Sequence, residues 1–206
     1  MSWFKRNIGW LLALIPALLL ALAASSFRYT QIYLPLDWTQ PINAGSAVGT
    51  LEQTYRGYDD QRRQRTVTVE VLGVAPVESF GGHAAVVGAT MWQLDLLLSA
   101  DPDQHLMHCE IEVVDAEGTR YGFEGGRRAA DPDDPFYSSV VLTPMCVPED
   151  APGPSLNPIT GEPVESPEVR PDSWELATAM VLPDGYEPQQ VRIGWDKPSF
   201  LVLDVP

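Results

Sequence analysis

An uncharged apolar run near the N-terminus limits what this chain can fold into more than any other feature. Residues 8–24, IGWLLALIPALLLALAA, contain no charged side chain, and a helix of about 17 to 25 such residues can span a bilayer. Lys5 and Arg6 precede the run, and the next charged residue is Arg28. Because basic residues favour the cytoplasmic side, the sequence predicts a cytoplasmic N-terminus and an extracytoplasmic remainder.

Two fates of this segment remain open. Ala21 and Ala23 fit the small-x-small pattern of a signal-peptidase site, and cleavage there would give a secreted protein. The run is, however, longer than the apolar core of most signal peptides. Aromatic residues also flank it like an interfacial belt, at Trp3, Phe4, Phe27 and Tyr29. We therefore expect an uncleaved anchor at residues 1–26, in the cell membrane, followed by an extracytoplasmic domain at 27–206.

The exported part is written in short alternating stretches separated by Gly, Pro and Asp, which is typical of strands. The clearest are TVTVEV at 66–71 and MWQLDLLLS at 91–99. Further strands are expected at 29–36, 49–55, 109–115, 119–123, 139–145, 175–182, 191–195 and 200–205. DAEG at 115–118 predicts a hairpin turn. Because no helical period follows Ala24, the sequence predicts an all-β fold, an antiparallel immunoglobulin-like β-sandwich preceded by one transmembrane helix.

One segment fits this pattern poorly. Residues 148–171 read PEDAPGPSLNPITGEPVESPEVRP, with a proline every few residues, so the segment cannot be a central strand. Loops of this length are functional, disordered or linkers. The three expected strands after it are too few for a stable sheet of their own. We interpret the segment as an excursion within a single domain, with a two-domain division as the alternative.

HLMHCE at 105–110 resembles a metal site on paper, with two histidines beside a cysteine. If the expected strand extends through it, His108 and Cys109 point to opposite faces. His105 and Cys109 would share a face but lie roughly 13 Å apart at about 3.3 Å per residue, whereas zinc ligands lie about 2 Å from the ion. The pattern therefore predicts no metal site.

The two cysteines predict a disulfide instead. In an oxidising compartment, Cys109 and Cys146 are each other's available partner. The bond would close a loop of about 38 residues and would stabilise the fold by about 4 kcal/mol on the chain-entropy estimate. Two buried free thiols are the alternative.

Acidic clusters are the remaining candidates for a site. They comprise Asp101 and Asp103, Asp115 and Glu117, and Asp131, Asp133 and Asp134. None completes a known loop with a distal bidentate Glu, so the first and third clusters are only weak calcium candidates. Pairs of carboxylates are too frequent in so acidic a chain to indicate a glycosidase. The sequence has no GxSxG. It predicts no catalytic residue and no cofactor.

The net charge, the tryptophans and a cluster of arginines limit which kinds of binding partner the sequence predicts. The formal net charge is -15, which disfavours nucleic acid. We expect Trp38, Trp92, Trp174 and Trp195 to be core residues rather than a stacking platform. Arg62, Arg63 and Arg65 are expected in an exposed hairpin loop just before a strand.

With the anchor, the strands and the ending LPDGYEPQQVRIGW in place, the chain resembles a type of bacterial envelope protein, notably of actinobacteria. In that type a single-pass anchor precedes an immunoglobulin-like β-sandwich; the resemblance implies no catalytic residue. The favoured hypothesis is a membrane-tethered domain, held through residues 8–24, that binds or scaffolds a protein partner in the envelope. The alternatives are a ligand-binding or sensor module, with calcium as a candidate ligand, and an envelope hydrolase of unfamiliar pattern.

Overall fold

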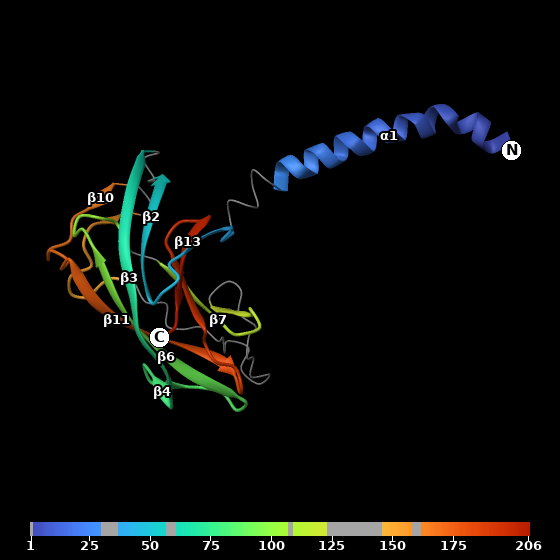
Figure 1. Cartoon of the computed structure of the whole chain (residues 1–206). Coiled ribbons are helices and arrows are strands. Elements are labelled where there is room, and N and C mark those ends of the chain that lie inside the picture. The colour runs from blue at the N-terminus through green and yellow to red at the C-terminus, as the bar shows by residue number, and fades with distance from the viewer. Residues whose placement is uncertain (1, 30–36, 57–60, 107–108, 123–145, 158–161) are drawn as a thin grey trace.

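The computed structural model describes residues 2–29, 37–56, 61–106, 109–122, 146–157 and 162–206 (Figure 1). These residues form one helix, α1 (Ser2–Arg28), and thirteen strands. The strands are β1 (Gln40–Asn43), β2 (Val48–Arg56), β3 (Arg62–Val77), β4 (Ser79–Phe80), β5 (His83–Ala84), β6 (Ala89–Ala100), β7 (Glu110–Val114), β8 (Arg120–Gly122), β9 (Ser155–Leu156), β10 (Pro163–Val164), β11 (Ser173–Pro183), β12 (Gln190–Gly194) and β13 (Ser199–Asp204).

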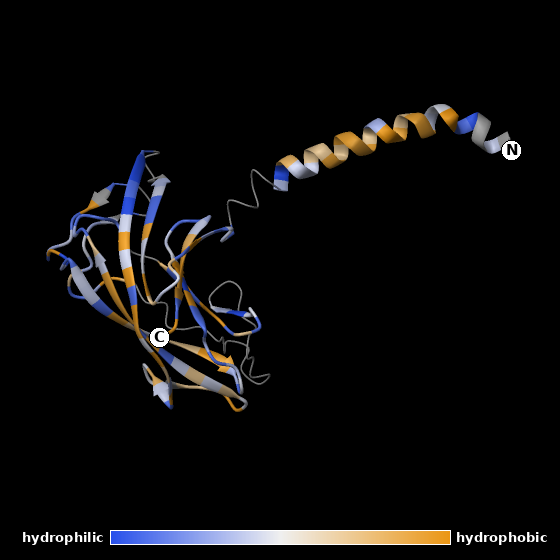
Figure 2. Ribbon diagram, in the orientation of Figure 1, coloured by the Kyte–Doolittle hydropathy of each residue, from blue (hydrophilic) through white to orange (hydrophobic). Residues whose placement is uncertain are grey.

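Helix α1 is apolar over most of its length (Figure 2). Its candidate membrane span, Arg6–Arg28, has 23 residues. At about 1.5 Å per residue this is about 35 Å, more than the roughly 30 Å hydrocarbon core of a bilayer. The structure thus confirms an N-terminal helix that is long and apolar enough to cross a membrane, a property that anchors and signal sequences share.

The first sheet has the order β11-β6-β3-β2, and all its pairs are antiparallel. Val67, Val69 and Val71 are buried, whereas the alternate residues of β3 face outward. In register, Val69 lies opposite Leu98 of β6, and Leu98 lies opposite Trp174 of β11. The alternation seen in the sequence therefore buries one face, as strand geometry requires, and the strands predicted at 49–55, 66–71, 91–99 and 175–182 are confirmed.

The second sheet has the order β1-β13-β12-β7-β8, with β1 parallel to β13 and the other pairs antiparallel. β7 and β8 form the hairpin predicted at DAEG. The Asp115 carboxylate accepts from the Thr119 N–H at 2.7 Å and from the Tyr121 hydroxyl at 2.9 Å. Gly118 occupies the left-handed region at φ 81°, where glycine is favoured. These bonds explain why the chain reverses here.

One hydrophobic core lies between the two sheets. Leu96 and Leu98 of the first sheet belong to the same buried cluster as Ile193 and Leu201 of the second. On one side the chain itself joins the sheets, because β1 at the edge of one continues into β2 at the edge of the other. The prediction of a mostly-β fold with antiparallel-rich sheets and one apolar N-terminal helix is confirmed.

Several predicted strands differ from the structure or fall outside the described residues. Of the predicted strand 29–36, Tyr29 ends the helical segment and residues 30–36 lie outside the described ranges, as do residues 139–145. Residues 105 and 106 are irregular, so the strand expected from HLMHCE begins only at Glu110. Sequence analysis missed β1, β4, β5, β9 and β10, because strands of two to four residues are too short to show alternation.

Candidate functional site

The described part of the proline-rich segment packs against the loop that follows β6. We call residues 146–157 and 162–172 the strap. It starts at Cys146, forms the short hairpin β9-β10, and leads into β11 at Ser173. The segment is therefore held in place by contacts that its composition did not predict.

Arg170 is the main link between the strap and this loop. Its side chain is only 1% exposed. Nη2 donates to the carbonyl oxygens of Asp101 at 2.7 Å and Gln104 at 2.9 Å, and Nη1 donates to that of Pro152 at 3.2 Å. The guanidinium carbon lies 5.1 Å from the centre of the Trp174 ring. One buried cation thus joins both ends of the strap to residues 101–104.

The surroundings of Arg170 make its burial costly and specific. Burial lowers the pKa of Arg170, and the charges of Asp101 and Asp103 oppose that shift. Its Nε finds no hydrogen-bond partner among the described residues. Gly153 lies at φ 75°, and a Cβ there would be 2.8 Å from Nη1 of Arg170. Close approach of the backbone to the guanidinium therefore requires glycine at this position.

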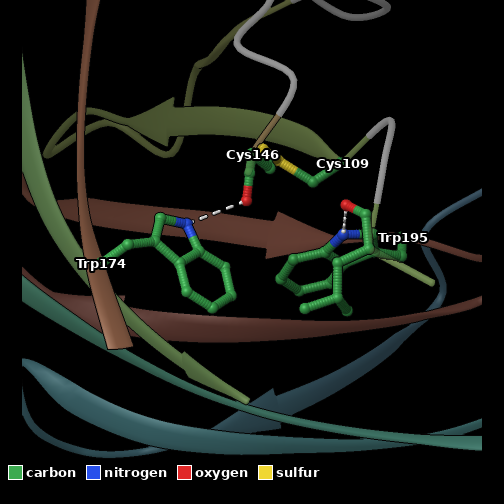
Figure 3. The surroundings of a disulfide bond; sticks show 5 residues. Cys109, Cys146, Trp174 and Trp195 are labelled. Carbon is green, nitrogen blue, oxygen red and sulfur yellow. Dashed lines mark hydrogen bonds between the residues drawn. A yellow bond between two sulfur atoms is a disulfide. The ribbon is translucent and has the colours of Figure 1, made fainter. Parts of the chain in front are cut away.

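A disulfide joins the start of the strap to the start of β7. Cys109 and Cys146 are bonded, with their Cα atoms 5.9 Å apart, and both are buried in the core cluster. Cys146 has φ 58°, which is uncommon for a residue other than glycine. Its carbonyl accepts from Trp174 Nε1 at 3.2 Å. Figure 3 shows the disulfide beside Trp174 and Trp195, each indole donating to a backbone carbonyl.

His105 contacts the strap. Its Nδ1 lies 3.1 Å from the Pro154 carbonyl oxygen. Burial lowers the pKa of His105, the bond to Pro154 opposes the shift, and the nearby arginines lower the pKa further. Among the described residues no group of three or more His, Cys, Asp or Glu side chains could hold a metal ion. His108 lies outside the described ranges.

A second buried arginine holds the other side of the same loop. Arg65 is 5% exposed, and its Nε and Nη2 donate to the His105 carbonyl at 3.0 and 2.9 Å. Nη1 forms an ion pair with Asp196 at 2.5 Å. The guanidinium also lies over the Tyr55 ring, 4.2 Å from its centre. The expectation of an exposed hairpin loop at 62–65 is wrong, because these residues belong to β3 and Arg65 faces inward.

The chain coming from α1 enters the sheets at this same end. The N–H groups of Thr39 and Gln40 donate to the Pro198 carbonyl at 3.1 and 3.0 Å. Trp38 stacks on Phe200 with 5.1 Å between ring centres. Pro198 lies two positions after Asp196, the partner of Arg65, so the entry of the chain at Thr39, the Arg65 network and the loop at residues 101–106 lie at one end of the domain.

The tryptophans expected in the core do lie in or against it. Trp174 is buried in the main cluster, Trp92 and Trp195 pack against that cluster, and Trp38 is buried with Phe200 and Val202. Those two strand residues lie in β13 of the second sheet. The four indoles therefore pack in or against the core; those of Trp174 and Trp195 also donate hydrogen bonds, whereas Trp92 Nε1 has no partner among the described residues.

A buried carboxylate lies on β7. Glu112 is 7% exposed, and its Oε2 is 4.0 Å from Nη1 of Arg120. That oxygen has no hydrogen-bond partner among the described residues. Arg192, directly opposite Glu112 in the sheet, lies over Phe200 at 5.2 Å instead. Burial raises the pKa of Glu112, and the two arginines lower it in part.

The calcium candidates divide into two groups. Asp101 and Asp103 form a turn, in which the Asp101 carboxylate accepts from the Asp103 N–H at 3.0 Å. This arrangement satisfies the backbone without an ion. Asp131, Asp133 and Asp134 lie outside the described ranges.

Comparisons with protein-family models, with curated proteins and with solved structures find no match to this chain. The strap and its arginines are therefore interpreted from their own geometry. Sequence reasoning missed both arginines as organising residues. The available signal was weak: Arg170 is the one basic residue in a segment rich in Asp and Glu.

Proposed function

We propose that this protein is a membrane-tethered, non-catalytic domain that binds or scaffolds another component of the cell envelope, with the strap as its contact surface. In this proposal α1 stays uncleaved and spans the membrane, with its N-terminus in the cytoplasm. Lys5 and Arg6 before the apolar run support that orientation. The disulfide supports an oxidising, extracytoplasmic location for the domain.

We further propose that the two sheets form an immunoglobulin-like sandwich. The order β13-β12-β7-β8 corresponds to strands G, F, C and C′ of that fold, and β11 beside β6 corresponds to E beside B. The hairpin of β2 and β3 next to β6 departs from the pattern. The disulfide departs too, because it starts at Cys109 before β7 rather than linking strands B and F.

The tether sets which end of the domain meets the membrane in this proposal. Trp38 is ten positions after Arg28, so an extended chain between them reaches at most about 35 Å. Because the tether enters at Thr39 beside Pro198, the end that carries the loop and the strap faces the bilayer. A partner at this end is an integral membrane protein or another component close to the membrane surface.

Charge supports a basic partner rather than the lipid surface. All 28 acidic residues follow Arg28, and three of the 13 basic residues lie at or before it, which leaves ten against 28 and a formal charge of -18 for residues 29–206. Apart from Arg170, the charged residues of the strap are acidic and exposed: Glu149, Asp150, Glu162, Glu165, Glu168 and Asp172. Such a surface repels anionic headgroups and attracts cationic groups.

The exposure of one apolar residue is the main reason for proposing the strap as the contact surface. Val169 is 81% exposed although its neighbour Arg170 is 1% exposed. An apolar side chain held in water next to a buried anchor is preorganised for a contact, because little conformational freedom is left to lose on binding. Val164, 46% exposed on β10, is a second exposed apolar residue of the strap.

Site-specific photocrosslinking in cells tests this proposal. A photoreactive residue at Val169 is expected to capture a discrete partner rich in Lys and Arg. The matched control is Val87, which is fully exposed in the turn between β5 and β6 and lies far from the strap end. Equal capture from both positions, or no discrete product from Val169, would overturn the role of the strap.

A further inference from the structure

We propose that the Cys109–Cys146 disulfide is a redox-sensitive lock: its reduction releases the strap from residues 101–106 as one unit while the two sheets remain paired. The regulatory meaning of this lock rests on the proposed function, since it would place the contact surface under redox control. The structural release itself does not depend on any partner.

The disulfide connects the strap to the domain without being part of either sheet. Cys109 precedes β7, and Cys146 is the first residue of the strap. Within the described residues, every strand pair of the two main sheets is formed by residues outside the strap, whose own pair is β9 with β10. Breaking the bond therefore removes a tie to the strap and leaves each ladder of main-chain hydrogen bonds in place.

The backbone at Cys146 favours release once the bond is gone. Its φ of 58° is a left-handed conformation that costs free energy for a residue with a side chain. Among the described residues it is held there by the disulfide, by the hydrogen bond from Trp174 Nε1 and by burial in the core cluster. With the disulfide broken, the covalent tie is gone, and only the hydrogen bond and the apolar packing oppose relaxation of this residue.

Besides the burial of Cys146 and Val147 in the core cluster and the main-chain bond from the Ala100 N–H to the Asp172 carbonyl, the described anchors of the strap are side-chain polar bonds that water can replace. Arg170 donates to the carbonyls of Asp101, Gln104 and Pro152, and His105 bonds to Pro154. A released Arg170 regains the hydration it loses in the folded strap, where its Nε has no partner among the described residues. The three bonds of Arg170 form and break together because one guanidinium makes all of them.

The chemistry of the lock is thiol–disulfide exchange with a dithiol. One thiolate of the dithiol attacks a sulfur of the disulfide, and the second thiol resolves the mixed disulfide. The S–S bond breaks, Cys109 and Cys146 each end as a thiol, and the dithiol is oxidised to its own disulfide. Because both cysteines are buried, the reaction proceeds through openings of the strap.

Hydrogen–deuterium exchange of the full chain in detergent micelles tests the lock. Dithiothreitol is the probe, and the oxidised protein is the reference. We expect exchange at least ten-fold faster in the strap and in residues 101–106 after reduction, with the central strands β3 and β6 unchanged. Oxidised Arg170→Ala, in which the disulfide still holds the start of the strap, is expected to speed exchange less than reduction does, and Val169→Ala, one position away and exposed, is expected to match the wild type.

Two results would overturn the lock. One is unchanged exchange in the strap after reduction, verified by thiol counting. The other is faster exchange in β3 and β6 together with the strap, which would make the disulfide a support of the whole domain. If the variant with both cysteines replaced by serine does not fold, the reduced wild type still decides the question. Because exchange needs no partner, failure here is distinct from failure of the crosslinking test.

Discussion

Replacing Arg65 with alanine tests whether the loop after β6 depends on a buried cation. The change removes two hydrogen bonds to the His105 carbonyl, the ion pair with Asp196 and the packing on Tyr55. Hydrogen bonds to a charged group contribute about 1.5–3 kcal/mol each, so the two bonds to the His105 carbonyl account for most of the loss. We expect Arg65→Ala to lower the free energy of unfolding by about 3–5 kcal/mol.

The two partners of Arg65 separate its contributions. The Asp196 side chain is 45% exposed, so Asp196→Ala should cost at most about 1 kcal/mol, as for surface ion pairs. The difference between the variants then measures the carbonyl bonds and the packing. Arg62→Ala, at an exposed position of the same strand, is the matched control and should change stability by less than about 0.5 kcal/mol.

Urea denaturation of the oxidised protein in micelles, followed by tryptophan fluorescence, measures these differences. Trp195 is a direct reporter because its Nε1 donates to the Leu106 carbonyl at 2.7 Å, next to His105. The reasoning is refuted if Asp196→Ala costs as much as Arg65→Ala, or if Arg65→Ala costs less than about 1 kcal/mol.

Three further variants test other parts of the structure. Because burial raises the pKa of Glu112, the folded state binds its proton more tightly than the unfolded state does, so stability is lost as pH rises above 4.5, the ordinary pKa. Glu112→Gln should flatten the slope of Tm against pH above 4.5, and an unchanged slope would contradict this. Burial, and then the Asp115 carboxylate, raise the pKa of Tyr121 to about 12; ultraviolet titration should show one phenol ionising near that pH, absent in Tyr121→Phe. Gly153→Ala, which places a Cβ 2.8 Å from Arg170 at a positive φ, should lower stability by about 1–3 kcal/mol in urea denaturation, and an unchanged midpoint would rule out the tight contact.

The sequence predicts the sheets better than the site, for a physical reason. Val67, Val69 and Val71 alternate with polar residues because one face of β3 is buried, and this local pattern is written in neighbouring positions. Arg65 and Arg170 have no such pattern. The partners of Arg170 at Asp101 and Gln104 are 69 and 66 positions away, so its role emerges only once the chain is folded.

Cys109 and His105, both in HLMHCE, show the same difference between local pattern and tertiary contacts. Opposite faces for adjacent residues are a property of a strand, and they hold from Cys109 onward, where Cys109, Ile111 and Val113 enter the core. His105 lies before the strand begins, and its position is set by the strap and by Arg65. The spacing argument against a zinc site assumed a strand through His105, which the structure does not have, and the actual contacts of His105 needed the tertiary structure.

The parallel pairing of β1 with β13 determines how the domain would carry a mechanical load. A pull on the anchor reaches the domain at Thr39 and Gln40 and runs along β1, whose residues Gln40–Asn43 pair with Ser199–Val202. The pull is directed along the strands, so it shears the pair, and the main-chain hydrogen bonds share the force instead of opening one after another. In the proposed membrane-tethered arrangement, the four-residue edge strand is thus a joint that resists tension between the anchor and the domain.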